Sequence, residues 1–146
     1  FIITYNNLSI IGIKNLLQGI LELRKKHSKD YQRIWFDTPI LREPDWQNIQ
    51  ILPTSYQMIH QEAIDWMKQN IETRDNRLHC IKDFEIQRME RDLAYMKKGT
   101  HDVDRKRADF WKFFKEYDKR HNRNIRDIFP QMSDFFNMCE MEANKW

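Results

Sequence analysis

The chain has 146 residues, of which 40% are hydrophobic, 13% aromatic and 32% charged, with a formal net charge of +3. This composition is typical of a folded, water-soluble domain and argues against a disordered or membrane-spanning protein. The longest apolar run, Leu8 to Leu23, is interrupted by polar residues and follows no basic segment of a signal peptide, so we expect a cytoplasmic location. The opening residues, Phe1 to Tyr5, have the pattern of a strand, which suggests a fragment of a longer chain.

Two short apolar segments flank the first predicted helix. Phe1 to Tyr5 and Arg33 to Phe36 are β-branched and aromatic, as buried strands are. Between them, from Leu8 to Leu23, apolar residues recur at spacings of about three to five positions, which predicts a helix. Strand, helix and strand of this size form a βαβ unit with parallel strands. Because two strands alone make an unstable sheet, either strands from outside this chain or the rest of the chain must cover them.

Polar side chains follow both predicted strands. Asn6 and Asn7 come after the first strand, and Asp37 and Thr38 come after the second. In a parallel sheet these ends lie at one rim, where amide and carboxylate groups bind polar ligands. Loop capping by the same side chains is the alternative. The following segment, through Leu52, is predicted to be a long ordered loop whose candidate site residues are Arg42, Glu43, Trp46, Gln47 and Gln50.

The rest of the chain has the period of helices. We predict one helix from Pro53 to about Asn70 and a second from about Lys82 to Gly99. A third covers Arg105 to Tyr117, with residues 118–126 as a loop or frayed turn, and a short helix begins at Ser133 or Asp134. These elements divide the chain into residues 1–52, a helical pair at 53–98 and an aromatic-rich helical extension at 99–146.

Aromatic and basic residues alternate in the third helix and the loop after it. The segment Lys97 to Arg126 has an excess of Lys and Arg, a pattern that can stack bases and neutralise phosphates. However, Phe110, Phe113, Phe114 and Tyr117 have the spacing of a core-facing stripe. We therefore favour core packing for these rings, with a nucleic-acid or protein-binding surface as the alternative.

No complete catalytic motif is present. Cys80 and Cys139 lie far apart without metal-ligand spacing, which favours two reduced thiols over a metal site. Most acidic residues alternate with Lys or Arg along helices, as solvated pairs do. The sequence has three glycines and contains no phosphate-binding loop, nucleophile elbow or zinc motif. The residues of this chain alone therefore show no complete active site.

The order of several short motifs resembles a known family. WFDTP is followed by IQILP, then by a helix that begins with KDFE, and finally by DFWKFF, DKR and FP near the end. This arrangement resembles the C-terminal half of the twitch-type radical S-adenosylmethionine proteins of phages and marine bacteria. The resemblance covers nearly the whole chain.

That resemblance implies a function and a fold. The chain would be the C-terminal part of a radical S-adenosylmethionine enzyme, an α/β fragment of a partial (β/α) barrel followed by a mainly helical region. The missing part would hold the CxxxCxxC motif, whose thiolates ligate a [4Fe-4S] cluster that binds S-adenosylmethionine. The remainder of that domain would be the partner, with a peptide or small molecule as substrate. Asn6, Asn7, Asp37 and Thr38 would line the rim where the cofactor binds.

Overall fold

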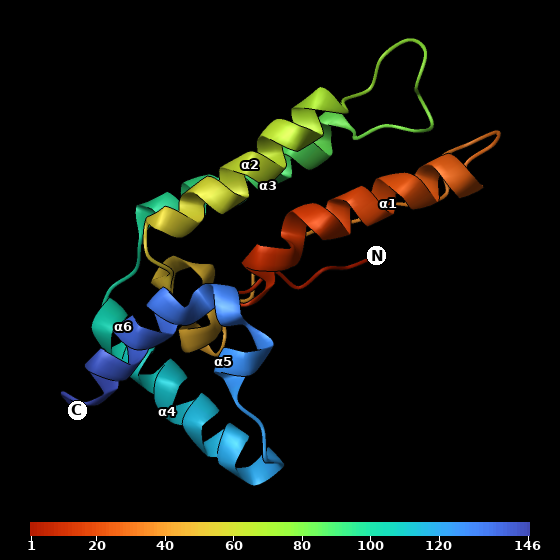
Figure 1. The fold of residues 1–146 in the computed structure, drawn as a ribbon. Coiled ribbons are helices and arrows are strands. Elements are labelled where there is room, and N and C mark those ends of the chain that lie inside the picture. The colour runs from red at the N-terminus through yellow and green to blue at the C-terminus, as the bar shows by residue number, and fades with distance from the viewer.

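The computed structural model describes all residues from Phe1 to Trp146, and it is an all-helical fold (Figure 1). Helical residues make up 64% of the chain, and no strand or sheet is formed. The prediction of an α/β partial barrel is therefore wrong. The α-helices are α1 (Ile13–His27), α2 (Ser55–Gln69), α3 (Asp83–Lys98), α4 (Val103–His121), α5 (Ile125–Ile128) and α6 (Ser133–Ala143). Short 3₁₀ helices are η1 (Ser9–Gly12), η2 (Asp45–Gln47), η3 (Ile49–Ile51) and η4 (Pro130–Met132).

The two predicted strands are extended segments joined by isolated bridges. Ile2 pairs with Asp37 and Tyr5 pairs with Ile40, both in the parallel sense. Between these two bridges lies Pro39, whose carbonyl accepts a hydrogen bond from the Tyr5 N–H at 2.8 Å. Because proline has no N–H, it gives none in return, and the ladder is interrupted at its centre. Two bridges without a third strand make no sheet, which is the physical reason for the failed barrel prediction.

Three helices form the elongated upper part of the molecule (Figure 1). α2 contacts both α1 and α3, and α3 turns back beside α2 after the loop at residues 70–82. Both of these segments are helical in the structure, and the period of the apolar residues explains this, since Ala63, Ile64 and Met67 of α2 are buried. Gly99 ends α3 with a φ of 72°, as the sequence predicts.

The lower part of the molecule is formed by α4 packed on α6, with α5 between them in sequence (Figure 1). Phe110 of α4 lies at the centre, with ring centroids 5.1 Å from Phe135 and 6.2 Å from Phe136. A hydrophobic core of 24 buried residues runs from this aromatic cluster to α1. α4 continues to His121, so the first part of the predicted loop at 118–126 is helical instead.

None of the helices combines the length and the apolar composition that crossing a lipid bilayer requires.

Candidate functional site

The two predicted asparagines do not face a common rim. The Asn6 side-chain oxygen accepts hydrogen bonds from the backbone N–H groups of Leu8 at 2.9 Å and Ser9 at 3.1 Å. Asn7 is fully buried, and its amide nitrogen donates to the Trp46 carbonyl at 3.0 Å. Its side-chain oxygen has no hydrogen-bond partner. Asn6 is therefore a loop cap, and Asn7 ties the first segment to η2.

Asp37 and Thr38 also have partners within the chain. Asp37 Oδ1 accepts from the Thr38 N–H at 2.9 Å and forms a half-exposed ion pair with Arg88 at 3.3 Å. The buried Thr38 hydroxyl donates to the Asp92 carboxylate at 3.0 Å. Of the four predicted cofactor-binding side chains, Asn6 and Asp37 thus cap backbone N–H groups, and Asn7 and Thr38 make contacts in the interior. None of these four side chains lines the apolar groove described below.

A buried polar network lies behind this region. The Tyr5 hydroxyl is 2.6 Å from His60 Nδ1, and His60 Nε2 is 2.7 Å from the Met89 carbonyl oxygen. Because that carbonyl can only accept, Nε2 carries the proton and Nδ1 accepts from Tyr5. Burial lowers the pKa of His60. Burial also raises the pKa of Tyr5, and the negative charge of the nearby Asp92 carboxylate raises it further. Burial also raises the pKa of Asp92 itself. These groups have the chemistry of an acid–base site, but no exposed surface through which a substrate can reach them.

A second buried contact is the ion pair between Arg24 of α1 and Glu85 of α3. Both side chains are fully buried, and the Arg24 Nη1 to Glu85 Oε2 distance is 2.9 Å. Arg24 also donates to the carbonyl oxygens of Cys80 at 2.8 Å and Ile34 at 3.0 Å. Glu85 accepts a further bond from the Lys82 N–H, which caps α3. Arg24 makes four hydrogen bonds to protein acceptors, and both side chains are fully buried. The pair therefore joins three parts of the chain and is not exposed to a ligand.

The loop after Asp37 is ordered, as predicted, by contacts to α3 and α4. Trp46 packs on the ring of Phe113 with centroids 4.4 Å apart, and Gln50 donates to the Tyr95 carbonyl at 2.8 Å. The Gln47 carbonyl accepts from the Asn7 N–H at 3.0 Å. Arg42 and Glu43 remain exposed to solvent without an ion pair.

The residues of this chain do not fit an iron–sulfur cluster. No group of three His, Cys, Asp or Glu side chains lies close enough together to hold a metal ion. Both Cys80 and Cys139 are buried free thiols, and burial raises the pKa of Cys139 to about 12. Thiolates are the ligands that such clusters need, and a single cluster needs three or four of them. Two separate, protonated thiols therefore cannot form that site.

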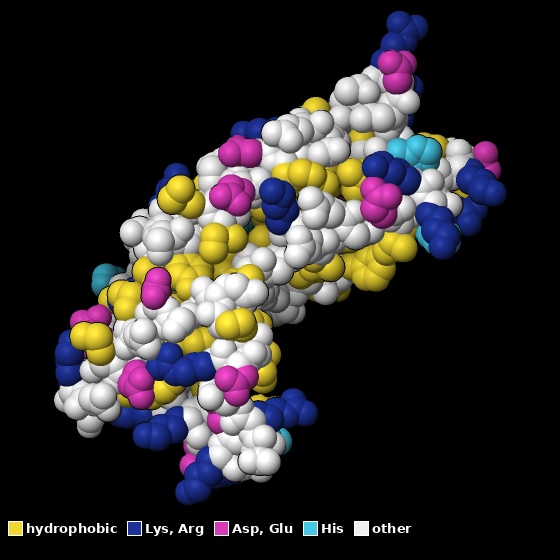
Figure 2. Space-filling view, in the orientation of Figure 1, with side chains coloured by type: hydrophobic (Ala, Val, Ile, Leu, Met, Phe, Trp, Pro, Cys, Tyr) yellow, Lys and Arg dark blue, Asp and Glu magenta, His cyan; other side chains and the backbone are white.

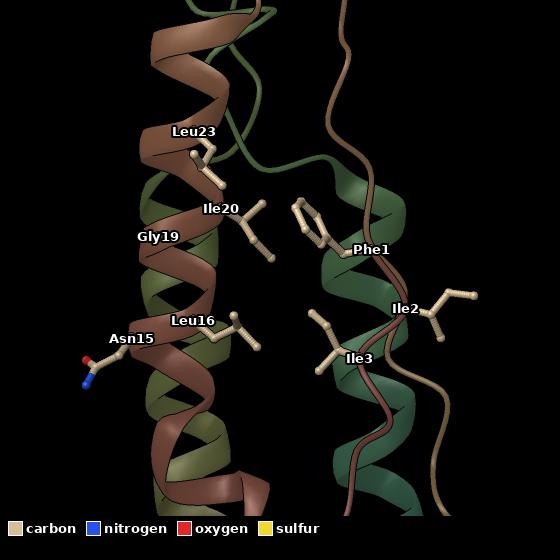
Figure 3. Close-up of a pocket in the computed structure, with 8 residues that line it drawn as sticks. All are labelled: Phe1, Ile2, Ile3, Asn15, Leu16, Gly19, Ile20 and Leu23. Atoms are coloured by element: carbon tan, nitrogen blue, oxygen red, sulfur yellow. The ribbon is translucent and has the colours of Figure 1, made fainter.

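A candidate site that opens to solvent is an apolar groove between α1 and the first extended segment (Figure 3). Its volume is about 520 Å³. The side chains of Leu16, Ile20 and Leu23 point from α1 toward those of Phe1 and Ile3. Phe1, Leu16 and Leu23 are exposed, which is uncommon for large apolar side chains gathered in one place.

An open backbone edge lies beside this groove. In the segment Phe1 to Tyr5, the odd-numbered residues make the hydrogen bonds to residues 37–41. The N–H groups of Ile2 and Thr4 and the carbonyl of Ile2 have no partner, because alternate residues of an extended chain face opposite sides. The Ile2 side chain points away from the groove and is 81% exposed. A third extended segment placed here would satisfy these groups.

The sequence contained one signal for the groove. The face of α1 buried in the core contains Ile13, Leu17 and Arg24, whereas Leu16 and Leu23 lie seven residues apart on a neighbouring face. A helix with one partner needs one apolar stripe, so a second stripe indicates a second contact. The polar residues at the predicted strand ends do not line the groove.

Comparisons with protein-family models, with curated proteins and with solved structures found no match to this chain.

Proposed function

We propose that this chain is the C-terminal part of a radical S-adenosylmethionine enzyme and that its role is to complete that enzyme by docking onto the part that binds the cluster. The resemblance of the ordered motifs, from WFDTP to the final FP, supports the identity of the enzyme. The observation that carries the docking role is the open edge at Ile2 and Thr4 beside the apolar groove.

The chemistry of this surface favours an extended polypeptide over a small polar ligand. Free N–H and carbonyl groups two residues apart match the spacing of another extended chain. The groove beside them offers apolar side chains for alternate residues of that chain, and its lining has Asn15 as its one polar side chain. Covering Phe1, Leu16 and Leu23 would also remove apolar surface from water, at about 25 cal/mol per Å².

The interior of the chain also supports a docking role for this chain, with the cluster bound by the preceding part. No group of side chains in this chain could hold the cluster, and the buried His60, Asp92 and Glu85 are each bonded to another side chain of the chain. In the proposed enzyme, the cluster supplies the reductive cleavage of S-adenosylmethionine. The residues of this chain would shape and close the docked assembly.

The first experiment is to express the reading frame that contains this segment, with its three expected cluster cysteines, without oxygen. We expect an iron–sulfur protein whose visible absorption changes when S-adenosylmethionine is added. A colourless protein from a frame without the cysteine triplet would contradict the enzyme assignment.

The docking role is tested separately by producing this chain and the preceding part of that frame as two tagged proteins. Leu16→Asp places a charge in the groove, so we expect it to abolish co-purification of the two parts. Met58→Asp is the matched control, because Met58 of α2 is a 69% exposed apolar residue outside the groove. Equal recovery of both variants would contradict docking at the groove.

A further inference from the structure

The loop between α2 and α3, residues 70–82, is a compact loop whose ends meet. Ile71 and Ile81 pair at its base in the parallel sense. Inside the loop, the Asn76 side chain accepts a hydrogen bond from the Thr73 N–H and donates to the Ile71 carbonyl at 3.1 Å. Ordered loops of this length that are packed by their own side chains frequently have a function.

The loop is also fixed to the end of α1. His79 Nε2 lies 2.7 Å from the Ser28 carbonyl oxygen, and Arg24 Nη1 donates to the Cys80 carbonyl at 2.8 Å. Figure 1 shows the loop projecting beyond the ends of α2 and α3, and Figure 2 shows Lys and Arg side chains together with an acidic one at the same tip. The backbone of the loop is therefore held in place before any ligand binds.

Two arginines without partners line one pocket on this loop. Arg74 and Arg77 are exposed, and neither guanidinium group takes part in an ion pair or a hydrogen bond within the chain. Both line a shallow pocket of about 520 Å³, together with Glu72 and Thr73, whose hydroxyl also makes no hydrogen bond. Asp75 lies between the arginines in sequence but is not among the lining residues.

The one carboxylate that lines the pocket is neutralised. Lys82 Nζ lies 3.1 Å from Glu72 Oε1 and also donates to the Arg77 carbonyl at 2.7 Å. The two guanidinium groups therefore leave the lining with two positive charges that no lining carboxylate balances. All of the free polar groups in the lining, including the Thr73 hydroxyl, can donate hydrogen bonds.

The basic segment that the sequence singles out, Lys97 to Arg126, offers no comparable arrangement. Its outer rings are partly exposed, Phe113 by 44% and Tyr117 by 38%, but they stack on each other with centroids 6.1 Å apart. The pocket beside them is lined by Lys112 together with the Glu116 carboxylate. The loop at 70–82 is therefore the surface where free cations share a pocket.

We propose that this loop binds a phosphate monoester through Arg74 and Arg77. The planar fork of a guanidinium group matches two phosphate oxygens, and the Thr73 hydroxyl would donate to a third. A monoester has a charge of about −1.5 to −2 at pH 7, which the two arginines balance, whereas a phosphodiester or a carboxylate has a single charge. The site is separate from the groove and does not depend on the proposed enzyme function.

The test titrates the ¹⁵N-labelled chain with inorganic phosphate at constant ionic strength and follows the arginine Nε–H signals by NMR. We expect the signals of Arg74 and Arg77 to shift until they saturate. Arg74→Gln and Arg77→Gln should each weaken binding at least about tenfold, because each removes a charge-assisted pair of hydrogen bonds. Arg74→Lys keeps the charge without the fork, so its affinity should lie between those of the glutamine variant and the unmodified chain.

The matched control is Lys29→Gln. Lys29 is an exposed cation without an ion pair, directly after the Ser28 that holds the loop, and it does not line the pocket. This variant should bind phosphate like the unmodified chain. O-phosphoserine in a parallel titration separates the two sources of the group, since tighter binding than phosphate would assign the site to an organic monoester and equal binding to free phosphate.

Three results would overturn the proposal. The first is the absence of saturable shifts at Arg74 and Arg77 in the unmodified chain. The second is an equal loss of affinity in Lys29→Gln and Arg74→Gln, which would show a general effect of surface charge. The third is equally tight binding of dimethyl phosphate, a monoanion, which would show that the pocket does not select the monoester.

Discussion

At the scale of single residues, the polar groups that look most like a catalytic site are held inside the fold. His60 accepts from Tyr5 and donates to the Met89 carbonyl, and Thr38 donates to Asp92. Together these bonds join α2 and α3 to each other and to the two extended segments. Because unpaired polar groups are costly in an interior, the network fixes how these parts fit together.

The neutral His60 makes stability depend on pH. Burial lowers its pKa below the ordinary value of 6.5, so the unfolded chain binds a proton at a pH where the folded chain does not. The free energy of unfolding should therefore fall as the pH drops from 6.5 toward the folded pKa, by at most about 1.4 kcal/mol per pH unit. Urea unfolding at pH 7.5 and about pH 5 measures this loss.

The control for this prediction is His60→Gln, which keeps a donor for Met89 but does not titrate. Its unfolding free energy should be lower at neutral pH yet depend less on pH between these values. Asp92 contributes with the opposite sign, because burial raises its pKa above 3.8 and its protonation favours the folded chain in more acidic solution. An unchanged pH dependence in the glutamine variant would assign the effect to other groups.

The Arg24–Glu85 pair should behave as a unit. Arg24→Met alone leaves the Glu85 carboxylate buried without its partner, so we expect a loss of about 3–5 kcal/mol in the free energy of unfolding. Arg24→Met with Glu85→Leu removes both charges, and its loss should be clearly smaller than the sum of the two single losses. Additive losses, measured by urea unfolding, would show that the two side chains act independently.

At the scale of elements, the helices were predictable because their apolar residues follow a period near 3.6. α2 and α3 lie where the pattern places them, and Gly99 ends α3 as expected. The helix boundaries were less well predicted, since α4 extends to His121 through a polar stretch that lacks any apolar period. Its capping by Asn122, with a φ of 50°, depends on backbone conformation and not on hydrophobicity.

Replacing two of the glycines by alanine should change the free energy of unfolding in opposite directions. Gly99 has φ 72° and ψ −176°, a conformation that only glycine adopts readily. Gly99→Ala should lower the free energy of unfolding by about 1–3 kcal/mol, although no atom obstructs the new methyl group. Gly19 lies within α1 in helical conformation with free space around it, so Gly19→Ala should raise stability by about 0.5–1 kcal/mol. Thermal unfolding of both variants checks the two signs.

At the scale of the whole molecule, the sequence could not reveal which side the two extended segments leave open. The parallel direction of their pairing follows from the helix between them, and the bridges from Ile2 to Asp37 and from Tyr5 to Ile40 have that direction. Whether such segments become a sheet depends on neighbours that no local pattern specifies. The hydrogen-bond partners of the four predicted site residues could not be predicted for the same reason, because burial and pairing are properties of the assembled core.

The same limit applies to the groove and to the exposed rings of α4. The groove requires α1 and Phe1 to Ile3 to lie side by side, and the contact between Trp46 and Phe113 requires a distant loop to pack on α4. Each was visible in the sequence only as an excess, either of apolar residues on α1 or of rings on α4. The sequence could not show which of these side chains the core leaves exposed.

The open edge at Ile2 and Thr4 has a consequence for handling the protein. Soluble proteins usually protect such edges with proline, lysine or an inward-pointing charge, and the segment Phe1 to Tyr5 contains none of these. Two copies can therefore align edge to edge, with the exposed Phe1 and Ile2 side chains adding apolar contact. We therefore expect the isolated chain to self-associate as its concentration increases. A segment bound along the open edge would prevent this aggregation.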